Sequence, residues 1–299
     1  MPERITEVTG LLAGILAPHA PLTVLVVGGD AAAFAGALSE ALIPGVVVIT
    51  SGALPPGDCV TVHLRSGRGR GEDEHAAQIV IDHHDPLWPV IRRVHPDLAD
   101  PEVWYLSESR AFFGVRAATW DVRFGDDLPA YAKAVHDAGV RPGDLALDVG
   151  CGTGRALPAL AAAAGPTGRV LGFDLTPDML VEARRAGRER FAALVVADAR
   201  RLPLPDARAD VVFAAGLVQH LPDPARGLAE LARVARPGGR LVIFHPSGRA
   251  ALAARHGRAL RPDEPLAEGR LGPLLSSIGW RLTSYDDPPD RFQAMAVRD

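Results

Sequence analysis

The sequence contains little lysine and little cysteine, and it lacks long apolar runs. Lys133 is the only lysine among 32 basic residues, and the formal net charge of −4 gives no general reason to expect nucleic acid as a partner. The two cysteines, Cys59 and Cys151, are too few for a disulfide framework, and neither has the nearby second cysteine typical of zinc sites. We therefore expect no bound metal.

No apolar run approaches the roughly 20 residues that a membrane-spanning helix needs. The opening MPERITEVTG also lacks the basic and then apolar stretches that mark a secretory signal. We expect a cytoplasmic protein that does not bind membranes. A chain of 299 residues, 47% of them hydrophobic, can form one large domain or two modest ones.

From Leu145 onward, short apolar segments alternate with amphipathic ones, which is typical of βα units and a mostly parallel sheet. The pattern predicts an α/β sheet of seven strands with helices on both faces, since continuously apolar strands are buried on both sides. The last two strands are close enough to pair as a hairpin. The expected strands are Leu145 to Val149, Val170 to Asp174, Ala193 to Val196, Val211 to Ala214, Arg240 to His245, Trp280 to Tyr285 and Phe292 to Arg298.

A smaller α/β pattern precedes this sheet. We assign residues 1–105 to a small α/β domain and residues 106–299 to the larger domain, in which residues 106–140 form a helical lid or linker. Residues 107–138 are expected to form two helices broken near Gly125. The small domain is expected to contain helices at Ile5 to Leu16 and Ala31 to Leu42, and strands at Thr23 to Val27, Val46 to Ile49, Cys59 to Leu64 and Gln78 to Ile81.

The stretch LALDVGCGTGRAL, residues 145–157, joins a strand to a helix through a glycine turn. A dinucleotide-binding turn has the spacing G-x-G-x-x-G, but the third glycine position is occupied by Arg155. Asp148 ends the strand beside the turn, where its carboxylate would repel a pyrophosphate and attract an ammonium group. The turn therefore favours a cofactor that carries an amine.

DVGCGTG resembles the first motif of class I S-adenosylmethionine-dependent methyltransferases, and the similarity extends over about 190 residues to the last one. It implies a Rossmann-like methyltransferase sheet with S-adenosylmethionine as cofactor. By this resemblance, Asp148 lies near the methionine amino group. The turn residues Gly150, Cys151, Gly152 and Gly154 surround the cofactor.

Two later strand ends resemble further motifs of the family. Asp174 in VLGFDLTPDML can accept both ribose hydroxyls, a feature that nicotinamide enzymes share. In VVADARRLPLPD, the resemblance places Asp198 at the adenine amino group and gives the backbone of Ala199 to the same base. Leu175 and Ala215 complete the expected cofactor site.

The fourth and fifth motifs lie in ADVVFAAGLVQHLPDPARGLAELARVARPGGRLVIFHP. They predict a helix from Pro224 to Arg236 that ends at Pro-Gly-Gly and buries one face. Leu228, Leu231 and Val234 or Ala235 make up that face.

Methyl transfer needs alignment more than acid–base chemistry, so few residues have to be catalytic. His220, after the fourth strand, is the first candidate for a general base and His245, after the fifth, is the second. Each could instead line the pocket without taking a proton.

The helical segment before the glycine turn contains residues that could bind an acidic or aromatic acceptor. They are Arg110, Phe112, Phe113, Arg116 and Trp120. We favour the alternative that the aromatic residues face the core and the arginines face solvent. The same alternative applies to Arg249, Arg255, Arg258 and Arg261.

VLVVGGDAAAFAGALSEAL resembles the start of a P-loop nucleoside kinase, but a phosphate loop starting at Gly28 would have Phe34 where its lysine belongs. We therefore expect a degenerate domain that serves packing, dimerisation or covering of the acceptor site. In IDHHDP, the side chains of Asp82, His83, His84 and Asp85 either bind a metal or form a polar loop, and we favour the loop.

The sequence thus predicts methyl transfer from S-adenosylmethionine to a small molecule, by a protein that could form a homodimer. A protein that binds the cofactor as a sensor or scaffold is the main alternative. A nicotinamide oxidoreductase is another.

Overall fold

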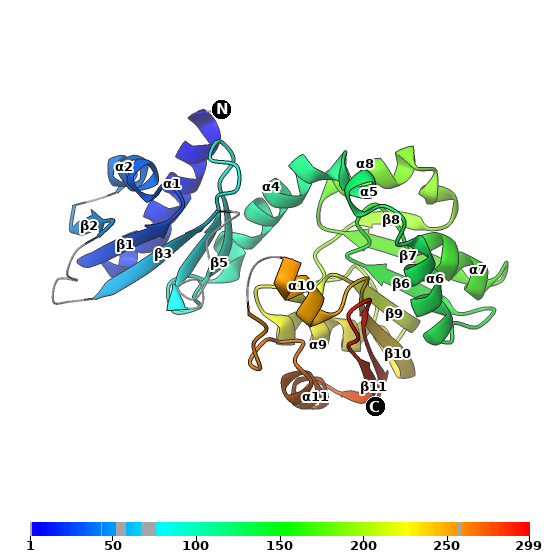
Figure 1. Ribbon diagram of the computed structural model, residues 1–299. Coiled ribbons are helices and arrows are strands. Elements are labelled where there is room, and N and C mark those ends of the chain that lie inside the picture. The colour runs from blue at the N-terminus through cyan, green and yellow to red at the C-terminus, as the bar shows by residue number, and fades with distance from the viewer. Residues whose placement is uncertain (1, 43, 52–57, 67–75, 256–258) are drawn as a thin grey trace. The chain divides into compact units, whose positions relative to one another are not determined.

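A computed structural model describes residues 2–42, 44–51, 58–66, 76–255 and 259–299. The described chain divides into two compact units, with the boundary between Phe112 and Phe113 inside one helix, α4 (Tyr105–Ala117). Figure 1 shows the succession of elements along the chain.

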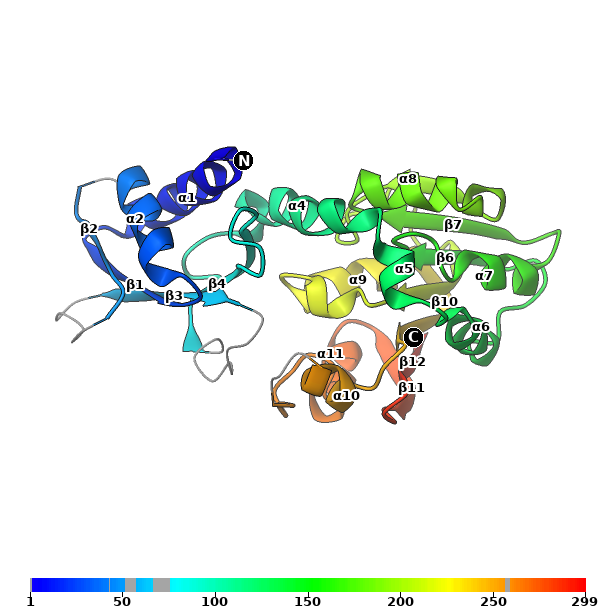
Figure 2. The ribbon, with the colours of Figure 1, turned by 45° about the horizontal axis from the view of Figure 1, so that its top comes forward.

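The N-terminal unit is built on a five-stranded sheet in the order β2-β1-β3-β4-β5. The first four strands run parallel and β5 is antiparallel to β4. The helices α1 and α2 lie on the same side of the sheet (Figures 1 and 2). The elements are α1 (Pro2–Leu16), η1 (Ala17–His19), β1 (Leu22–Gly28), α2 (Ala31–Ala41), β2 (Val46–Ile49), β3 (Cys59–Arg65), β4 (Ile79–Asp82), β5 (Val90–Val94) and η2 (Pro101–Val103).

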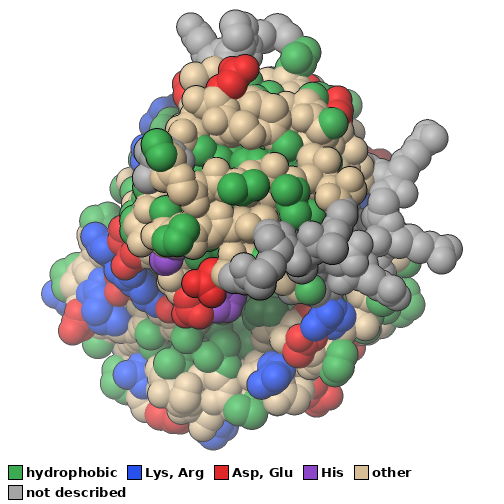
Figure 3. Space-filling view, turned by 90° about the vertical axis from the view of Figure 1, so that its left-hand side faces the viewer, with side chains coloured by type: hydrophobic (Ala, Val, Ile, Leu, Met, Phe, Trp, Pro, Cys, Tyr) green, Lys and Arg blue, Asp and Glu red, His purple; other side chains and the backbone are tan. Residues whose placement is uncertain are grey.

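The expected helices and strands of this unit are confirmed, but the prediction missed β5. Its sequence, VIRRV, has two adjacent arginines and lacks a regular apolar alternation. The structure explains both side chains, since Arg93 donates to the carbonyl of Ala77 and the Arg92 guanidinium lies 3.8 Å from the ring centre of Phe112. Hydrophobic side chains are also exposed on the face that Figure 3 shows.

The C-terminal unit contains the expected seven-stranded sheet, in the order β11-β12-β10-β9-β6-β7-β8. Its strands are parallel except β12, which is antiparallel to both β10 and β11. The strands are β6 (Leu145–Val149), β7 (Arg169–Asp174), β8 (Ala193–Val196), β9 (Ala209–Ala215), β10 (Ala235–His245), β11 (Trp280–Asp286) and β12 (Phe292–Arg298).

Helices cover both faces of this sheet, as predicted, and two hydrophobic clusters lie beneath them. One cluster includes Leu228 and Leu231 of α9 with Leu271 of α11, and the other includes Val135 of α6 with Leu160 of α7. The helical elements are α5 (Trp120–Phe124), α6 (Leu128–Asp137), α7 (Leu157–Ala164), α8 (Pro177–Arg185), η3 (Arg188–Arg190), η4 (Val218–His220), α9 (Pro224–Val234), α10 (Arg249–Arg255) and α11 (Glu268–Ser277).

Two helix boundaries differ from the prediction. α9 ends at Val234 and not at Arg236, because Ala235 is extended and already pairs with Ala209 of β9. The stretch 107–138 contains three helices and not two, since the chain also breaks between α4 and α5. The predicted break at Gly125 is confirmed, and its φ of 56° is one that glycine adopts readily.

A buried ion pair holds the N-terminal unit together. Glu108 of α4 is 1% exposed and accepts hydrogen bonds from the Arg4 side chain and the backbone N–H of Ile91. Removing one partner leaves the other charge buried without compensation, which is costly.

We therefore expect Glu108→Ala to lower the free energy of unfolding of this unit by about 3–5 kcal/mol. Urea unfolding followed by circular dichroism measures the change. Glu7→Ala is the matched control, because Glu7 pairs with the same arginine but is 63% exposed, and it should cost at most about 1 kcal/mol. Equal effects of the two substitutions would contradict this account.

Candidate functional site

The glycine turn after β6 is fixed by hydrogen bonds to the next strand. The N–H groups of Gly150 and Cys151 both donate to the carbonyl of Phe173, at 2.8 and 2.9 Å. Gly152 has a φ of 54°, and a Cβ built there meets no atom of the described chain within 4 Å. A Cβ at Gly154 would lie 2.7 Å from the Leu157 side chain. The turn is thus packed on one side and open at Gly152.

Asp148 lies at the end of β6, directly before this turn. It is 1% exposed, and neither carboxylate oxygen has a hydrogen-bond partner among the described residues. Burial, and secondarily the charge of Asp174, raise the pKa of Asp148 to about 8. An unpartnered buried carboxyl group is costly to the fold, so a cationic ligand that ionises it would gain a strong interaction.

Asp174 ends β7, the neighbouring strand. Its carboxylate accepts hydrogen bonds from the N–H of Gly152 and from the N–H of Thr176, both at 2.8 Å. Burial raises the pKa of Asp174 to about 6, although these two hydrogen bonds oppose the rise. Oδ2 of Asp174 therefore links the end of β7 to the turn at Gly152. Leu175, the next residue, is half-buried.

Asp198, after β8, has a partner that the sequence analysis missed. The guanidinium of Arg200 donates to it from Nε at 3.0 Å and from Nη2 at 2.7 Å. The Arg200 side chain is almost fully buried. Ala199, between Asp198 and Arg200, is buried as well. The backbone N–H of Arg200 also donates to Oδ1 of Asp198 at 2.9 Å, so both carboxylate oxygens accept hydrogen bonds from Arg200.

The two candidate bases have different surroundings. His220 belongs to η4, which follows β9, and its ring meets the Phe113 ring edge-on at 5.1 Å. His245 ends β10, and its Nδ1 lies 3.1 Å from the backbone nitrogen and 3.0 Å from the carbonyl oxygen of Ser247. Nδ1 of His245 is therefore engaged locally.

Ala215, which was expected to complete the cofactor site, lies at the end of β9 and is half-buried.

Charged side chains join the glycine turn to residues 121–127, which we call the strap. Thr153 donates to Asp121 at 2.5 Å, and Arg188 binds the other oxygen of Asp121 at 2.7 Å. Arg155 is 5% exposed, forms an ion pair with Asp127 and donates to the carbonyl of Gly125. Burial raises the pKa of Asp127, against the lowering effect of Arg155.

This network gives Arg155 a role that the sequence analysis did not assign. In the sequence, this residue departs from the dinucleotide pattern. In the structure its guanidinium points to the strap and holds it beside the turn. The only sign of this role in the sequence is that Arg155 directly follows Gly154 of the glycine turn.

The other arginines of the sequence analysis are mostly paired. Arg249 binds Glu264 and Asp287, Arg261 binds Asp263, and Arg255 donates to Ser247. Arg258 lies outside the described residues. Arg110 and Arg116 both lie on α4, as does Phe112.

In the N-terminal unit, Asp82 accepts from both the backbone N–H and the ring of His84. His83 is buried, which lowers its pKa. Within the residues that the structure describes, no group of three or more His, Cys, Asp or Glu side chains is arranged to hold a metal ion. Nor does any helix in those ranges have the length and apolarity to cross a membrane.

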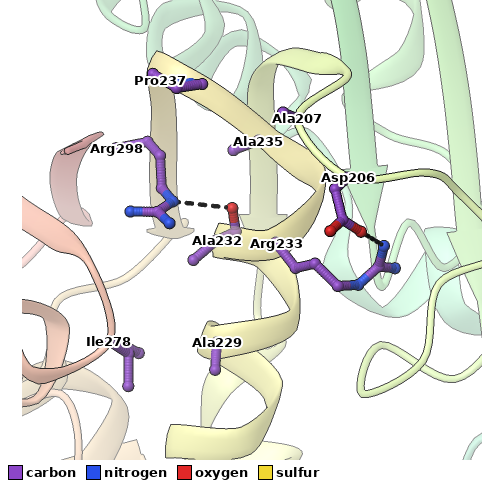
Figure 4. Close-up of a pocket in the computed structure, with 9 residues that line it drawn as sticks. All are labelled: Asp206, Ala207, Ala229, Ala232, Arg233, Ala235, Pro237, Ile278 and Arg298. Carbon is purple, nitrogen blue, oxygen red and sulfur yellow. Dashed lines mark hydrogen bonds and ion pairs between the residues drawn. The ribbon is translucent and has the colours of Figure 1, made fainter.

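A hollow of about 350 Å³ lies at the amino-terminal ends of β9, β10 and β11 (Figure 4). Its arginines are already used, since Arg233 binds Asp206 and Arg298 donates to the carbonyl of Ala232. The unpartnered carboxylate of Asp148 is at the opposite strand ends. We therefore assign the candidate site to the glycine turn and not to this hollow.

Asp148 leads to a prediction about pH. A carboxyl group whose pKa is raised in the folded state stabilises the fold fully below its unfolded pKa of about 4, and this contribution is lost progressively as pH rises from there to about 8. Asp148→Asn cannot ionise, so at pH 9 and without ligand it should be more stable than the wild type by about 1–3 kcal/mol. Urea unfolding at pH 5 and pH 9 measures this difference.

The same substitution should remove a pH dependence of S-adenosylmethionine binding. In the wild type, affinity should fall by up to about tenfold per pH unit below 8, because the proton must leave before the carboxylate can bind a cation. Asp290→Asn, at an exposed position, should behave like the wild type in calorimetric titrations. A pH-independent wild-type affinity would contradict this assignment.

Comparison with known proteins shows what part of the chain resembles. Residues 147–243 match a family model described as "Methyltransferase domain". An uncharacterised 37.1 kDa protein in transposon TN4556 of Streptomyces fradiae is 44% identical over 123 residues, which cover 40% of this chain and 36% of that protein. The ubiquinone/menaquinone biosynthesis C-methyltransferase UbiE of Burkholderia mallei is 40% identical over 119 residues, which cover 38% of this chain and 47% of UbiE.

Solved structures share the fold. Magnesium protoporphyrin IX methyltransferase (ChlM) of Synechocystis, with bound S-adenosylhomocysteine, matches with a TM-score of 0.52 and 18% identity over 64% of this chain and 99% of that one. The chain spans less than half the length of the two curated relatives above. The family match covers the glycine turn, β7 to β9 and most of β10. Residues 147–243 are therefore similar to a methyltransferase domain.

Proposed function

We propose that the protein transfers a methyl group from S-adenosylmethionine to a small-molecule acceptor. The observation that carries the proposal is the buried carboxylate of Asp148, which has no hydrogen-bond partner among the residues described and lies beside the open backbone of Gly152. A cofactor with an ammonium group satisfies this carboxylate. A pyrophosphate would be repelled by it, which disfavours a nicotinamide cofactor.

Three strand ends would hold the cofactor. Asp148 binds the methionine ammonium group, Asp174 accepts from the ribose hydroxyls, and Asp198 receives the adenine amino group with help from the backbone of Ala199. Arg200 orients the Asp198 carboxylate through hydrogen bonds from its backbone N–H and its guanidinium. Gly150, Cys151, Gly152, Gly154, Leu175 and Ala215 line the same edge.

When bound, S-adenosylmethionine supplies a methyl group on a cationic sulfur, so the acceptor's new bond to carbon forms as the carbon–sulfur bond breaks and sulfur keeps the electron pair. The protein must position the acceptor and exclude water. The strap is suited to this task because Thr153, Arg155 and Arg188 hold it beside the glycine turn.

For a hydroxyl acceptor, His220 is the group that takes the proton. It follows β9, which neighbours β6 in the sheet, and Leu217 of the same loop packs against Gly150. His245 is less suited, since its Nδ1 is engaged with the Ser247 backbone.

The proposal predicts formation of S-adenosylhomocysteine from S-adenosylmethionine when a panel of small phenols and amines is supplied, detected by mass spectrometry. Asp174→Asn should weaken cofactor binding about 10- to 100-fold, as expected for losing hydrogen bonds to a charged group. Cofactor binding without product from any acceptor would favour the sensor or scaffold alternative. Absence of cofactor binding would refute the proposal.

His220→Asn should lower kcat for a hydroxyl acceptor by about 100-fold or more and remove a pH dependence near neutrality. Gln219→Ala, at the exposed neighbouring position, is the matched control and should retain the wild-type kcat. A loss below tenfold, with the pH profile intact, would show that His220 only lines the pocket.

For the N-terminal unit, we propose a degenerate nucleotide-binding domain that does not turn over nucleoside triphosphates. The turn after β1 lacks the lysine that a phosphate loop uses, and the Asp30 carboxylate accepts from the N–H of Ala33 at the start of α2. This carboxylate occupies the position where a phosphate loop would bind an anion. A homodimer stays a prediction.

Titration with magnesium ATP should therefore give no binding heat up to about millimolar concentration, which is far weaker than a functional site binds. S-adenosylmethionine titrated into the same sample serves as the control for a folded protein. Micromolar ATP binding would overturn the degenerate assignment.

A further inference from the structure

The order of strands shows on which side of the proposed cofactor the acceptor must lie. Asp198, Asp174 and Asp148 follow or end β8, β7 and β6, which are consecutive in the sheet. The proposed contacts therefore run from adenine at β8 to the methionine group at β6. The next strand beyond β6 is β9, so the residues that follow β9 border the reacting end. His220 is one of them.

An aromatic row lies against His220. The Phe113 ring, in the C-terminal half of α4, packs edge-on against the His220 ring with centres 5.1 Å apart. Trp120 of α5 packs against Phe113 at 5.8 Å, and Phe124 packs against Trp120 at 4.7 Å. The row thus extends from the candidate base along the helices next to the glycine turn.

This row differs from the aromatic residues of the core. Phe213 and Phe244 are almost completely buried and belong to the cluster between the sheet and α6 and α7. Phe113 and Trp120 are only half-buried, and neither belongs to the two described clusters that pack on the seven-stranded sheet. Their rings therefore retain accessible surface that the core does not require.

The row is also held in place by the cofactor turn. Asp121 directly follows Trp120 and receives hydrogen bonds from Thr153 and Arg188. On the opposite side of Phe113, a Cβ at Gly114 would lie 3.1 Å from the Asp178 carboxylate at the start of α8, so the backbone of α4 is close to that side chain. Both ends of the Phe113–Trp120 pair are thus fixed to elements that border the cofactor site.

We infer that Phe113 and Trp120, with His220, form the acceptor-binding wall and select a flat aromatic acceptor. The inference rests on the proposed function and adds a substrate class to it. Aromatic rings attract another ring beyond the effect of buried area, through offset or edge-on stacking. A saturated molecule of the same size and with the same hydroxyl group loses this stacking. The wall therefore favours a flat aromatic molecule over a saturated molecule of the same size.

The test compares 2-naphthol with decahydro-2-naphthol, which has the same carbon skeleton without aromatic rings. Each is titrated into the full-length protein saturated with S-adenosylhomocysteine. We expect 2-naphthol to bind at least tenfold more tightly, and Trp120→Ala and Phe113→Ala to weaken it at least tenfold. Trp120→Leu keeps an apolar side chain and should show the same loss.

Val115→Ala is the matched control, because Val115 lies on the same helix as Phe113, α4, and is 52% exposed. It should change the affinity for 2-naphthol by less than twofold. Affinity for S-adenosylhomocysteine should stay within threefold of wild type in all variants, which shows that each variant is folded at the cofactor site.

Equal binding of the two probes, or binding of neither, would overturn the inference, as would wild-type affinity for 2-naphthol in Trp120→Leu and Phe113→Ala. These results leave the proposed methyl transfer intact, since cofactor binding and product formation are measured separately. Failure of S-adenosylmethionine to bind would instead refute the proposed function.

Discussion

The candidate site depends on two carboxyl groups that the fold buries next to each other. Asp148 and Asp174 end neighbouring parallel strands, so their charges meet in a region of low polarity. Burial raises the pKa of both, to about 8 and about 6. Asp174 is compensated by two backbone N–H groups, but Asp148 has no partner within the described ranges. This imbalance makes the edge suitable for a cation.

The glycine turn connects this electrostatic feature to the rest of the unit. Its backbone is tied to β7 through the carbonyl of Phe173, while its side chains, Thr153 and Arg155, reach to the strap. One short segment therefore borders the proposed cofactor and positions the aromatic row.

Much of the fold could be predicted because its signals are local. The strands of the seven-stranded sheet are short apolar segments, and the helix α9 has a regular buried face with Leu228 and Leu231. β5 escaped prediction because its arginines are satisfied by distant partners, Ala77 and Phe112. The end of α9 was misplaced because Ala235 pairs with Ala209, and helix periodicity contains no information about that pairing.

The sequence alone determined the order of motifs and hence the three acidic strand ends, because carboxyl ends of parallel strands meet at one edge. Only the tertiary structure decided how these groups are paired. Asp198 shares its charge with Arg200, and Arg155 and Thr153 reach partners about thirty residues away at Gly125 and Asp121. The sequence analysis could not foresee such contacts, since they depend on how helices pack over the turn and not on local spacing.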